Sequence, residues 1–600
     1  MTPPTPLTFD TPHGWCFGWY HAPAAPWRDL AVVLCPPVGY EAICSYPTQV
    51  QLARSLAEAG FPVLRFDYHG TGDSSGGDDD AARVQAWSTT VECAVAQARA
   101  LSGANHLCLF GLRLGATLAV DVAGRLGGVD ELVLWAPCPS GKAFVRELRA
   151  GGSEDGDGIR AQGFRFAAAT VQELLALDAT KVAFAPAPRV LVIPRDDIPA
   201  EGPLPKALRA RGADVQVQSL PGYAAMVGEP RAGVLDAPTL QSLADWLAAS
   251  PAAAPRTEPP RLAAASDEPR PLPDARETTL AMGADGSLVG VLCEPADAPA
   301  NERASTAVVL LNVGGNYRIG PQRIYVKAAR TLAAAGYRVL RLDIAGVGDS
   351  PPPAGQGWGR LYEKDSSRDV SAAIDALAQR GCGEFVLMGI CSGSYVAFQS
   401  SLVEPRVGGA VLMNSRLLEW TPGKPGDDWQ SSMQQYAKST AYYRRVLFHP
   451  TVWLRALRGE VNVRLIASRF LALAKARIKR FFAVGSPREE TLLDKMQRLC
   501  TRGCDVLMLV SDADDGRDYV EFHFGASGRR LRSHANYRMA YIPDADHTFT
   551  RPGNEAMVLD ELLRHLDRRS PSRSDRGTGP TQATPRTEAP AITPGGLAPG

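Results

Sequence analysis

The chain has 600 residues, with 64 Lys and Arg, 64 Asp and Glu, and 45% hydrophobic residues. Chains longer than about 250–300 residues usually divide into domains, so two large domains are expected. The balanced charge argues against a nucleic-acid partner and against electrostatic attachment to an anionic membrane. No apolar run approaches the roughly 18 residues of a membrane span, so no stable membrane insertion is expected.

The N-terminus and the cysteines indicate a cellular compartment. Residues 1–10 are rich in Pro and Thr and lack the basic and apolar regions of a signal peptide. The 11 cysteines are scattered without CxxC pairs, which argues against a disulfide framework or a zinc site. These features favour a cytoplasmic protein that uses neither a metal nor another cofactor.

The chain contains an internal repeat. Ala53–Ser74 (ARSLAEAGFPVLRFDYHGTGDS) aligns without a gap to Ala329–Ser350 (ARTLAAAGYRVLRLDIAGVGDS), at an offset of 276 residues. This offset is far longer than a solenoid period and indicates a duplicated domain. Composition then predicts four parts: domains at 1–250 and 275–568, a Pro- and Ala-rich linker at 251–274, and a disordered tail at 569–600.

The elements of the second copy show the fold class most clearly. Short apolar runs alternate with longer helical periods, which is typical of an α/β fold with a mostly parallel sheet covered by helices on both faces. Ligands of such sheets bind at the carboxyl ends of the strands. Strands are expected at 307–311, 338–343, 385–390, 408–413, 506–510 and 537–542. Helices are expected at 323–335, 367–379, 395–402 and 555–566.

The most informative motif follows the expected strand at 385–390. Gly389-Ile-Cys-Ser-Gly393 fits the pattern G-x-nucleophile-x-G, in which the nucleophile lies on a strained turn between a strand and a helix. The glycines are needed because a side chain at either position would collide with the neighbouring strand or helix. Cys391 occupies the central position, and its place at a helix N-terminus is expected to lower the pKa of its thiol.

Two alternatives to a Cys391 nucleophile remain open. A motif centred on Ser392 would need glycine at positions 390 and 394, where the chain has Ile390 and Ser394. The other alternative is a buried cysteine without a catalytic role, since free cysteine is often a small apolar core residue. The register of the motif and its repeated α/β context favour Cys391.

The base and the acid of a triad are expected in the loops after later strands. His547 lies after the last expected strand, from where it can reach a nucleophile at the same end of the sheet; a surface histidine is the alternative. The loop Ser511-Asp-Ala-Asp-Asp515 offers three acids. Asp514 is the first choice, Asp512 is the second, and Asp515 stays open.

An oxyanion hole is expected beside the nucleophile. One donor would be the backbone N–H of Ser392, and the other that of Val313 or Gly314, in the loop Asn312-Val-Gly-Gly-Asn316 after an early strand. A preorganised donor of this kind contributes roughly 2.7–4 kcal/mol in the transition state. A tight turn without a catalytic role is the alternative for the glycines.

The first copy lacks these groups. Its elbow at 111–115 has Arg113 at the nucleophile position, and arginine is always protonated and cannot attack a carbonyl. Ala225 aligns with the base, while Asp196 or Asp197 remains as an acid. The sequence therefore predicts a pseudo-enzyme domain, which braces the active copy or binds a ligand or partner. Arg113 would pair with a bound anion or with a neighbouring acid.

The second copy is longer than the first between its elbow and its base. The extra residues fall mainly between 420 and 498, where helical periods at 429–443, 452–457 and 463–482 carry aromatic and basic side chains. We expect a helical cap there, which excludes water and shapes an acyl pocket. Its basic residues would meet an anionic carrier, such as a phosphopantetheine or coenzyme A thioester, or form a solvated helix face.

Both copies resemble the α/β-hydrolase superfamily, particularly its cap-bearing serine aminopeptidase-like and lipase-like branch. The segment Asp-Ile-Ala-Gly-Val-Gly-Asp-Ser at 343–350 is similar to the D-x-x-G-x-G-x-S turn of that branch, and 67–74 repeats it. Through 389–393 and 546–549, the second copy also resembles bacterial hydrolases associated with exosortase and exopolysaccharide systems. The resemblance implies two tandem α/β-hydrolase domains, whose order of nucleophile, acid and base matches Cys391, Asp514 and His547.

Cysteine departs from the serine that this superfamily usually has at the elbow. In that one position the chain resembles dienelactone hydrolases and polyhydroxyalkanoate synthases, and no substrate follows. We expect an esterase- or thioesterase-type acyl hydrolase or acyltransferase, acting through an acyl-cysteine on a small-molecule ester or thioester, free or carrier-bound. The alternative is a non-catalytic tandem scaffold that binds a small molecule or a carrier partner. The sequence does not indicate an oligomeric state.

Overall fold

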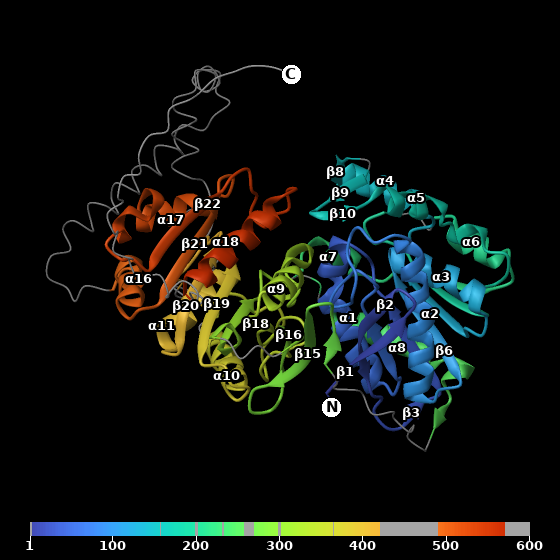
Figure 1. The fold of residues 1–600 in the computed structure, drawn as a ribbon. Helices are drawn as coiled ribbons and strands as arrows, with labels where there is room; N and C mark the ends of the chain where they lie inside the picture. Colours follow the sequence, from blue (N-terminus) through green and yellow to red (C-terminus); the bar gives the residue numbers. More distant parts are fainter. Residues whose placement is uncertain are drawn as a thin grey trace, which may run out of the picture.

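In a computed structural model, each copy forms a mostly parallel sheet flanked by helices, as the sequence predicted (Figure 1). The expected cap helices at 429–443, 452–457 and 463–482 lie outside the described residues, as does the expected tail beyond Arg569. The structure describes residues 3–420 and 490–569, apart from residues 157, 199–201, 231–232, 234, 257–268, 298–301 and 364.

The sheet of the first copy has the order β1-β2-β5-β4-β6-β7-β11-β12 within the described ranges. β1, β2 and β5 pair antiparallel, and all further neighbours pair parallel. The strands are β1 (Thr5–Thr11), β2 (Gly14–His21), β4 (Leu30–Cys35), β5 (Val63–Phe66), β6 (His106–Leu112), β7 (Glu131–Trp135), β11 (Arg189–Ile193) and β12 (Asp214–Val217).

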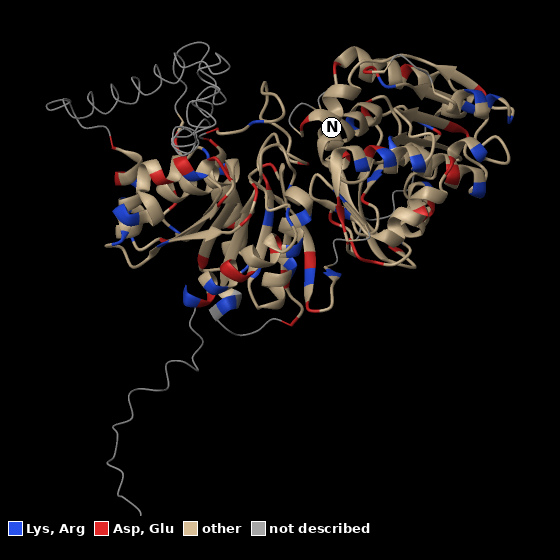
Figure 2. Cartoon of the chain, turned by 90° about the horizontal axis from the view of Figure 1, so that it is seen from above, with Lys and Arg blue, Asp and Glu red and all other residues tan. Residues whose placement is uncertain are grey.

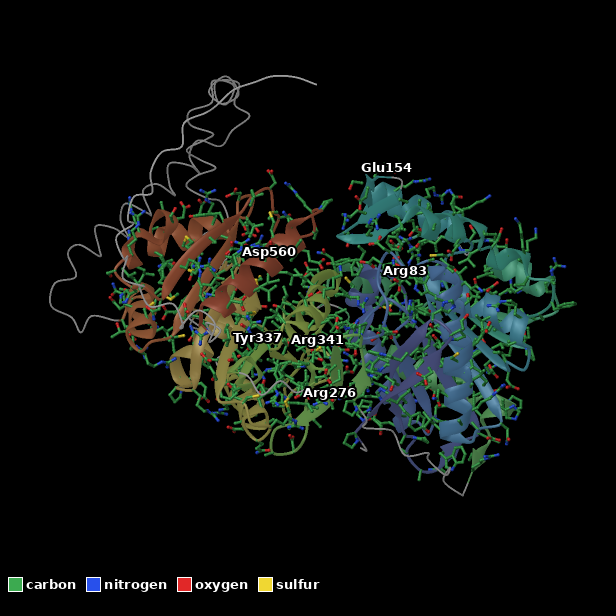
Figure 3. The ribbon with its side chains drawn as sticks, viewed as in Figure 1. Arg83, Glu154, Arg276, Tyr337, Arg341 and Asp560 are labelled. Carbon is green, nitrogen blue, oxygen red and sulfur yellow. The ribbon has the colours of Figure 1, made fainter. Side chains whose placement is uncertain are left out.

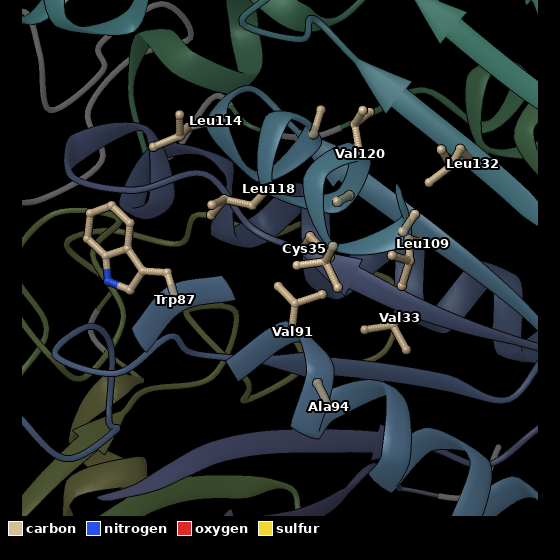
Figure 4. Packing of buried hydrophobic residues seen from close by; sticks show 14 of the residues in the cluster. Val33, Cys35, Trp87, Val91, Ala94, Leu109, Leu114, Leu118, Val120 and Leu132 are labelled. Atoms are coloured by element: carbon tan, nitrogen blue, oxygen red, sulfur yellow. The ribbon is translucent and has the colours of Figure 1, made fainter. Parts of the chain in front are cut away.

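Apolar side chains fill both faces of this sheet. β4 is buried at every position, which explains why it is a continuous apolar run and not an alternating one. On one face, Trp87 and Val91 of a covering helix pack with Val33 and Leu109 of the sheet (Figure 4). The helices of this copy are α1 (Tyr40–Glu58), α2 (Arg83–Ser102), α3 (Leu114–Leu126), α4 (Gly141–Gly151), α5 (Ala168–Ala176), α6 (Leu204–Arg209), α7 (Tyr223–Gly228) and α8 (Ala237–Ala248).

The second sheet has the order β14-β15-β16-β18-β17-β19-β20-β21-β22. Apart from the additional edge strand β14, this repeats the order of the first sheet. Its neighbours from β18 to β22 pair parallel, as the sequence predicted. The strands are β14 (Arg270–Pro271), β15 (Ala275–Met282), β16 (Leu288–Pro295), β17 (Thr306–Leu311), β18 (Arg338–Asp343), β19 (Glu384–Ile390), β20 (Val407–Met413), β21 (Asp505–Ser511) and β22 (Tyr537–Ile542). The helices are α9 (Ile324–Ala334), α10 (Ser366–Ala378), α11 (Ser392–Val403), α16 (Leu492–Thr501), α17 (Gly516–Phe524) and α18 (Asn554–Arg569).

Between β7 and β11 in the chain, the first copy contains an antiparallel sheet that the sequence analysis did not predict. It consists of β8 (Gly152–Asp155), β9 (Gly158–Ala161) and β10 (Phe164–Phe166), and it lies between α4 and α5 in the chain. In Figure 1 it lies over the first copy, and β10 lies on the side that faces the second copy. The first copy therefore carries its own insertion at the chain position where the second copy has its expected cap.

Both ends of the expected linker belong to sheets. β13 (Pro255–Arg256) pairs with β3 (Trp27–Arg28), and β14 pairs with β15. Acidic and basic residues are interspersed over both halves of the molecule (Figure 2). None of the helices in the described ranges is long and apolar enough to cross a membrane.

The two copies meet through an ion-pair arrangement that the repeat itself generates. The Arg65 guanidinium lies 2.7 Å from an Asp349 carboxylate oxygen, and Arg341 pairs in the same way with Asp73. Each pair joins the two copies, and the repeat offset relates Arg65 to Arg341 and Asp73 to Asp349. Figure 3 labels Arg341 where the halves meet. The interface is thus self-complementary, as in a two-fold dimer of separate chains.

Arg318 lies inside this interface without solvent exposure. Its guanidinium is 2.7 Å from Asp73 of the first copy, 2.8 Å from Asp343 and 2.7 Å from Asp349. Burying a charge in this way is favourable only when its partners are close and well oriented. The D-x-x-G-x-G-x-S turns of both copies therefore supply the carboxylates that hold the copies together.

Candidate functional site

Cys391 lies on a strained turn between β19 and α11. Its backbone has φ 56° and ψ −114°, and its N–H donates to the Met413 carbonyl at 2.9 Å. A Cβ on Gly389 would lie 2.0 Å from the Gly393 backbone, and one on Gly393 would lie 2.6 Å from the Leu311 carbonyl oxygen. The turn therefore requires both glycines and presents residue 391 at the carboxyl end of the sheet.

The structure brings His547 and Asp514 together. His547 Nδ1 is hydrogen-bonded to a carboxylate oxygen of Asp514, whose other oxygen accepts the Gly516 N–H at 2.5 Å. Asp514 is buried, whereas Asp512 is half-exposed and pairs with Arg517 at 3.2 Å. The geometry therefore places Asp514, and not Asp512, behind the imidazole.

The pKa values of the thiol and the imidazole move in opposite directions. Burial raises the pKa of Cys391, but the hydrogen bond and charge of His547, with Tyr362 and Arg416, outweigh it and leave the pKa below its ordinary value of 9.0. Burial lowers the pKa of His547, but its bonds to Asp514 and Cys391 outweigh this effect and raise it to about 9. Both shifts favour the transfer of the thiol proton from Cys391 to His547.

The Ser392 hydroxyl ties the elbow to the loop after β17. Its Oγ accepts the N–H of Gly314 at 2.7 Å and donates to the Asn312 carbonyl at 3.4 Å. This contact gives the Ser392 side chain a role in positioning the loop. It also occupies the Gly314 N–H, so of the two alternatives for the second oxyanion donor the geometry leaves Val313.

Two side chains that the sequence analysis missed border the thiol. The Tyr362 hydroxyl lies 3.7 Å from Cys391 Sγ, and Tyr362 has a positive φ of 62°. Arg416 Nε is 2.8 Å from Asp515, and its guanidinium is 3.8 Å from Asp514. Neither residue lies in a motif, so only the fold reveals that they converge.

Replacing Tyr362 by phenylalanine is expected to raise the pKa of Cys391 by about one pH unit. A hydrogen bond to a charged group contributes about 1.5 kcal/mol, and one pH unit corresponds to 1.36 kcal/mol. The pH dependence of Cys391 alkylation by iodoacetamide measures this shift. Tyr395→Phe is the matched control, because that ring packs on Tyr362 at 5.2 Å. Equal shifts in both variants would contradict a specific hydroxyl contact.

A cavity of about 410 Å³ opens above the thiol. Its volume lies in the range of small-molecule sites, and residues of both copies form its wall. The described residues hold no cluster of His, Cys, Asp and Glu suited to a metal ion. From the second copy the lining is Val313, Gly314, Gly315, Asn316, Pro321, Gln322, Leu361, Tyr362, Cys391, Ser392, Arg416, His547 and Thr548, and from the first it is Tyr40, Ile43, Gln162, Phe164, Glu229 and Pro230.

The equivalent positions of the first copy are engaged in structural contacts. Arg113 adopts the same elbow conformation, with φ 54°, and its guanidinium pairs with Glu41 at 2.8 Å and with Glu147. These ion pairs agree with the neighbouring-acid alternative for Arg113. Asp196 accepts backbone N–H groups at the start of α7, the helix that carries Ala225. The remaining acid therefore caps a helix.

Comparison with known proteins gives a match for each copy. Residues 308–557 match the family described as alpha/beta hydrolase family, and residues 43–150 match the one described as serine aminopeptidase, S33. Protein ABHD12B from Homo sapiens is 31% identical over 123 residues, which are 20% of this chain and 32% of that protein. The chain thus spans about a third of the length of this curated relative.

Some solved structures are similar to part of the chain at low identity. A serine hydrolase without a lid from Xanthomonas campestris is 18% identical, covers 41% of this chain and 93% of its own, and has a TM-score of 0.26. A thermophilic esterase from Thermogutta terrifontis is 18% identical, covers 49% of this chain and 99% of its own, and has a TM-score of 0.29. Each therefore covers less than half of this chain.

Proposed function

Because both copies belong to the alpha/beta-hydrolase superfamily, we propose that the second copy is an acyl hydrolase or acyltransferase with Cys391 as its nucleophile. The observation that carries the proposal is that Cys391 and His547 line the same cavity, with His547 hydrogen-bonded to the buried Asp514. A nucleophile, a base and an orienting acid in this geometry are suited to covalent acyl transfer. The substrate is a small-molecule ester or thioester, free or carrier-bound.

Acylation begins once His547 has taken the thiol proton of Cys391. Cys391 Sγ attacks the carbonyl carbon, a C–S bond forms, and the carbonyl π electrons move to the oxygen. The backbone N–H groups of Ser392 and Val313 hold this oxyanion. The intermediate collapses, the bond to the leaving alcohol or thiol breaks, and the His547 imidazolium protonates the leaving group.

Deacylation reverses the role of the imidazole. His547, now neutral, takes a proton from water or from an acceptor alcohol or amine as it attacks the acyl-cysteine. The C–S bond breaks, Cys391 leaves as a thiolate, and the imidazolium is restored. Asp514 keeps the imidazole oriented and stabilises its charge in both steps, because the hydrogen bond and charge of His547 lower the pKa of this buried carboxyl.

Thiol reactivity tests this function before any substrate is known. Of the 11 cysteines, only Cys391 and Cys93 are partly exposed, so Cys93 is the control. Burial raises the pKa of Cys93, and Glu92 raises it further. At pH 7 iodoacetamide should therefore label Cys391 at least tenfold faster than Cys93, since the thiolate is the reacting species. Peptide mass spectrometry follows both sites.

The pH dependence of labelling and of hydrolysis distinguishes the titration of Cys391 from that of His547. Alkylation of Cys391 should fall as the pH falls through its lowered pKa, where the thiolate gains a proton. Ester hydrolysis should fall there too, and again as the pH rises through about 9, where His547 loses the proton it gives to the leaving group. Labelling of Cys391 no faster than Cys93, unchanged by His547→Ala, would favour the non-catalytic scaffold.

A further inference from the structure

The first copy closes one side of the cavity above Cys391. Tyr40 and Ile43 belong to the start of α1, Gln162 and Phe164 to the β9–β10 hairpin, and Glu229 follows α7. These three segments come together on the side of the first copy that faces the second. Without the first copy, this side of the cavity would be open to solvent.

The β9–β10 hairpin is built to approach the second copy closely. Its two-residue turn, Gln162-Gly163, has φ angles of 48° and 87°, the positive values that a tight hairpin turn needs. A Cβ on Gly163 would lie 2.3 Å from the Gln322 side chain of the second copy. Glycine at the tip therefore serves both the turn and the contact between copies.

Within the second copy, Gln322 connects the tip of this hairpin to the loop that carries His547. Gln322 Nε2 donates to the Thr548 carbonyl, one residue after His547, at 3.4 Å. The next residue, Arg323, donates to carbonyl oxygens of the first-copy turn, including those of Gly72 at 2.8 Å and Ser74 at 2.7 Å. Gln322 thus lies between the hairpin tip and the loop that carries His547.

The first-copy wall is largely apolar and aromatic. Phe164 packs against an apolar cluster to which both copies contribute, and within it Tyr46 of the first copy stacks on Tyr317 of the second with centroids 3.7 Å apart. Tyr40 and Pro230 extend the same surface into the cavity. Such a wall binds an apolar group and excludes water from it.

We propose that the first copy is the acyl-binding domain of the site, in which Phe164 and Tyr40 hold a bulky apolar acyl group of the substrate beside Cys391. This assignment rests on the proposed function of Cys391. The first copy, which has Arg113 at the nucleophile position, then contributes to specificity. Its insertion between β7 and β11 forms part of the substrate cavity of the second copy.

Alkylating agents of graded size test the assignment without turnover. The full chain is treated with iodoacetamide and with its N-benzyl and N-hexyl derivatives, and the rate at Cys391 is followed by mass spectrometry. Phe164→Ala should slow the two bulky reagents by about tenfold and leave iodoacetamide within about twofold, since a lost apolar contact affects only the bulky group. Tyr40→Ala, on a different element, should do the same.

A control variant and the possible outcomes distinguish a failure of the acyl-binding role from a failure of the proposed function of Cys391. Phe184→Ala removes an exposed phenylalanine of the same copy, outside the cavity lining, and should change neither rate. Unchanged or faster bulky reagents in both Phe164→Ala and Tyr40→Ala, with Cys391 still highly reactive, would overturn the acyl-binding role alone. An unreactive Cys391 in the unaltered protein would overturn both proposals. Should Phe164→Ala fail to fold, Tyr40→Ala decides the question.

Discussion

Replacing Cys391 by alanine should lower kcat for ester or thioester hydrolysis by roughly 10⁴- to 10⁶-fold, the range found when a member of a catalytic triad is removed. The effect is large because the thiolate forms the covalent bond that divides the reaction into two easier steps. Hydrolysis of a p-nitrophenyl ester and of an acyl thioester, each with an apolar acyl group, measures kcat. Mass spectrometry of the unaltered protein should show an acyl adduct on Cys391.

Two matched variants make this result specific. Cys93→Ala removes the other partly exposed thiol and should keep full activity. Ser392→Ala removes a hydroxyl that positions the Gly314 loop and should cost about tenfold or less, the value of one hydrogen bond. If Ser392→Ala abolished hydrolysis while Cys391→Ala retained it, the nucleophile would be Ser392 and the mechanism above would be wrong.

Local patterns were sufficient to predict the parallel strands of the second sheet. The strands expected at 338–343 and 537–542 have the same bounds in the structure, and the others differ by one residue at one or both ends. Strands β17, β19 and β21 were predictable because a strand buried on both faces is nearly continuously apolar. The elbow was predictable for a related reason, since close backbone approach at Gly389 and Gly393 tolerates no side chain.

The loop after β21 shows where pattern reasoning becomes insufficient. Asp512, Asp514 and Asp515 are chemically alike and close in sequence, so only the direction of each side chain distinguishes them. In the structure, Asp514 is buried and turns to His547, while Asp512 and Asp515 pair with arginines. Tyr362 was missed for the same reason, because its position depends on the path of an irregular segment.

The contact between the copies was beyond the sequence analysis because it requires two elements far apart in the chain. Arg65 and Arg341 lie on strands of two different copies. Each pairs with an aspartate of the other copy, and Arg341 also pairs with Glu277 of its own copy. Once the copies face each other, the repeated turn explains these buried arginines as one self-complementary interface.

Replacing Arg318 by methionine should lower the free energy of unfolding by about 3–5 kcal/mol, the usual cost of breaking a buried ion pair from one side. Methionine fills part of the volume but leaves Asp73, Asp343 and Asp349 without the guanidinium that lies within 2.8 Å of each. Urea unfolding at pH 7, followed by tryptophan fluorescence and by hydrolytic activity, measures the loss. Both signals should move to lower urea together, because the cavity needs both copies.

The pH dependence of that loss shows whether charge is its cause. Burial raises the pKa of Asp73 and Asp349, but the neighbouring arginines outweigh burial and lower both values. In the unaltered protein this stabilisation is present above the unfolded value of about 3.9 and is lost at lower pH. The difference between Arg318→Met and the unaltered protein should therefore shrink as the pH falls below about 3.9, where these carboxylates gain protons. Arg517→Met removes a half-exposed pair and should cost less than about 1 kcal/mol at any pH. A loss of that size for Arg318→Met would mean that apolar contacts, and not this network, join the two copies.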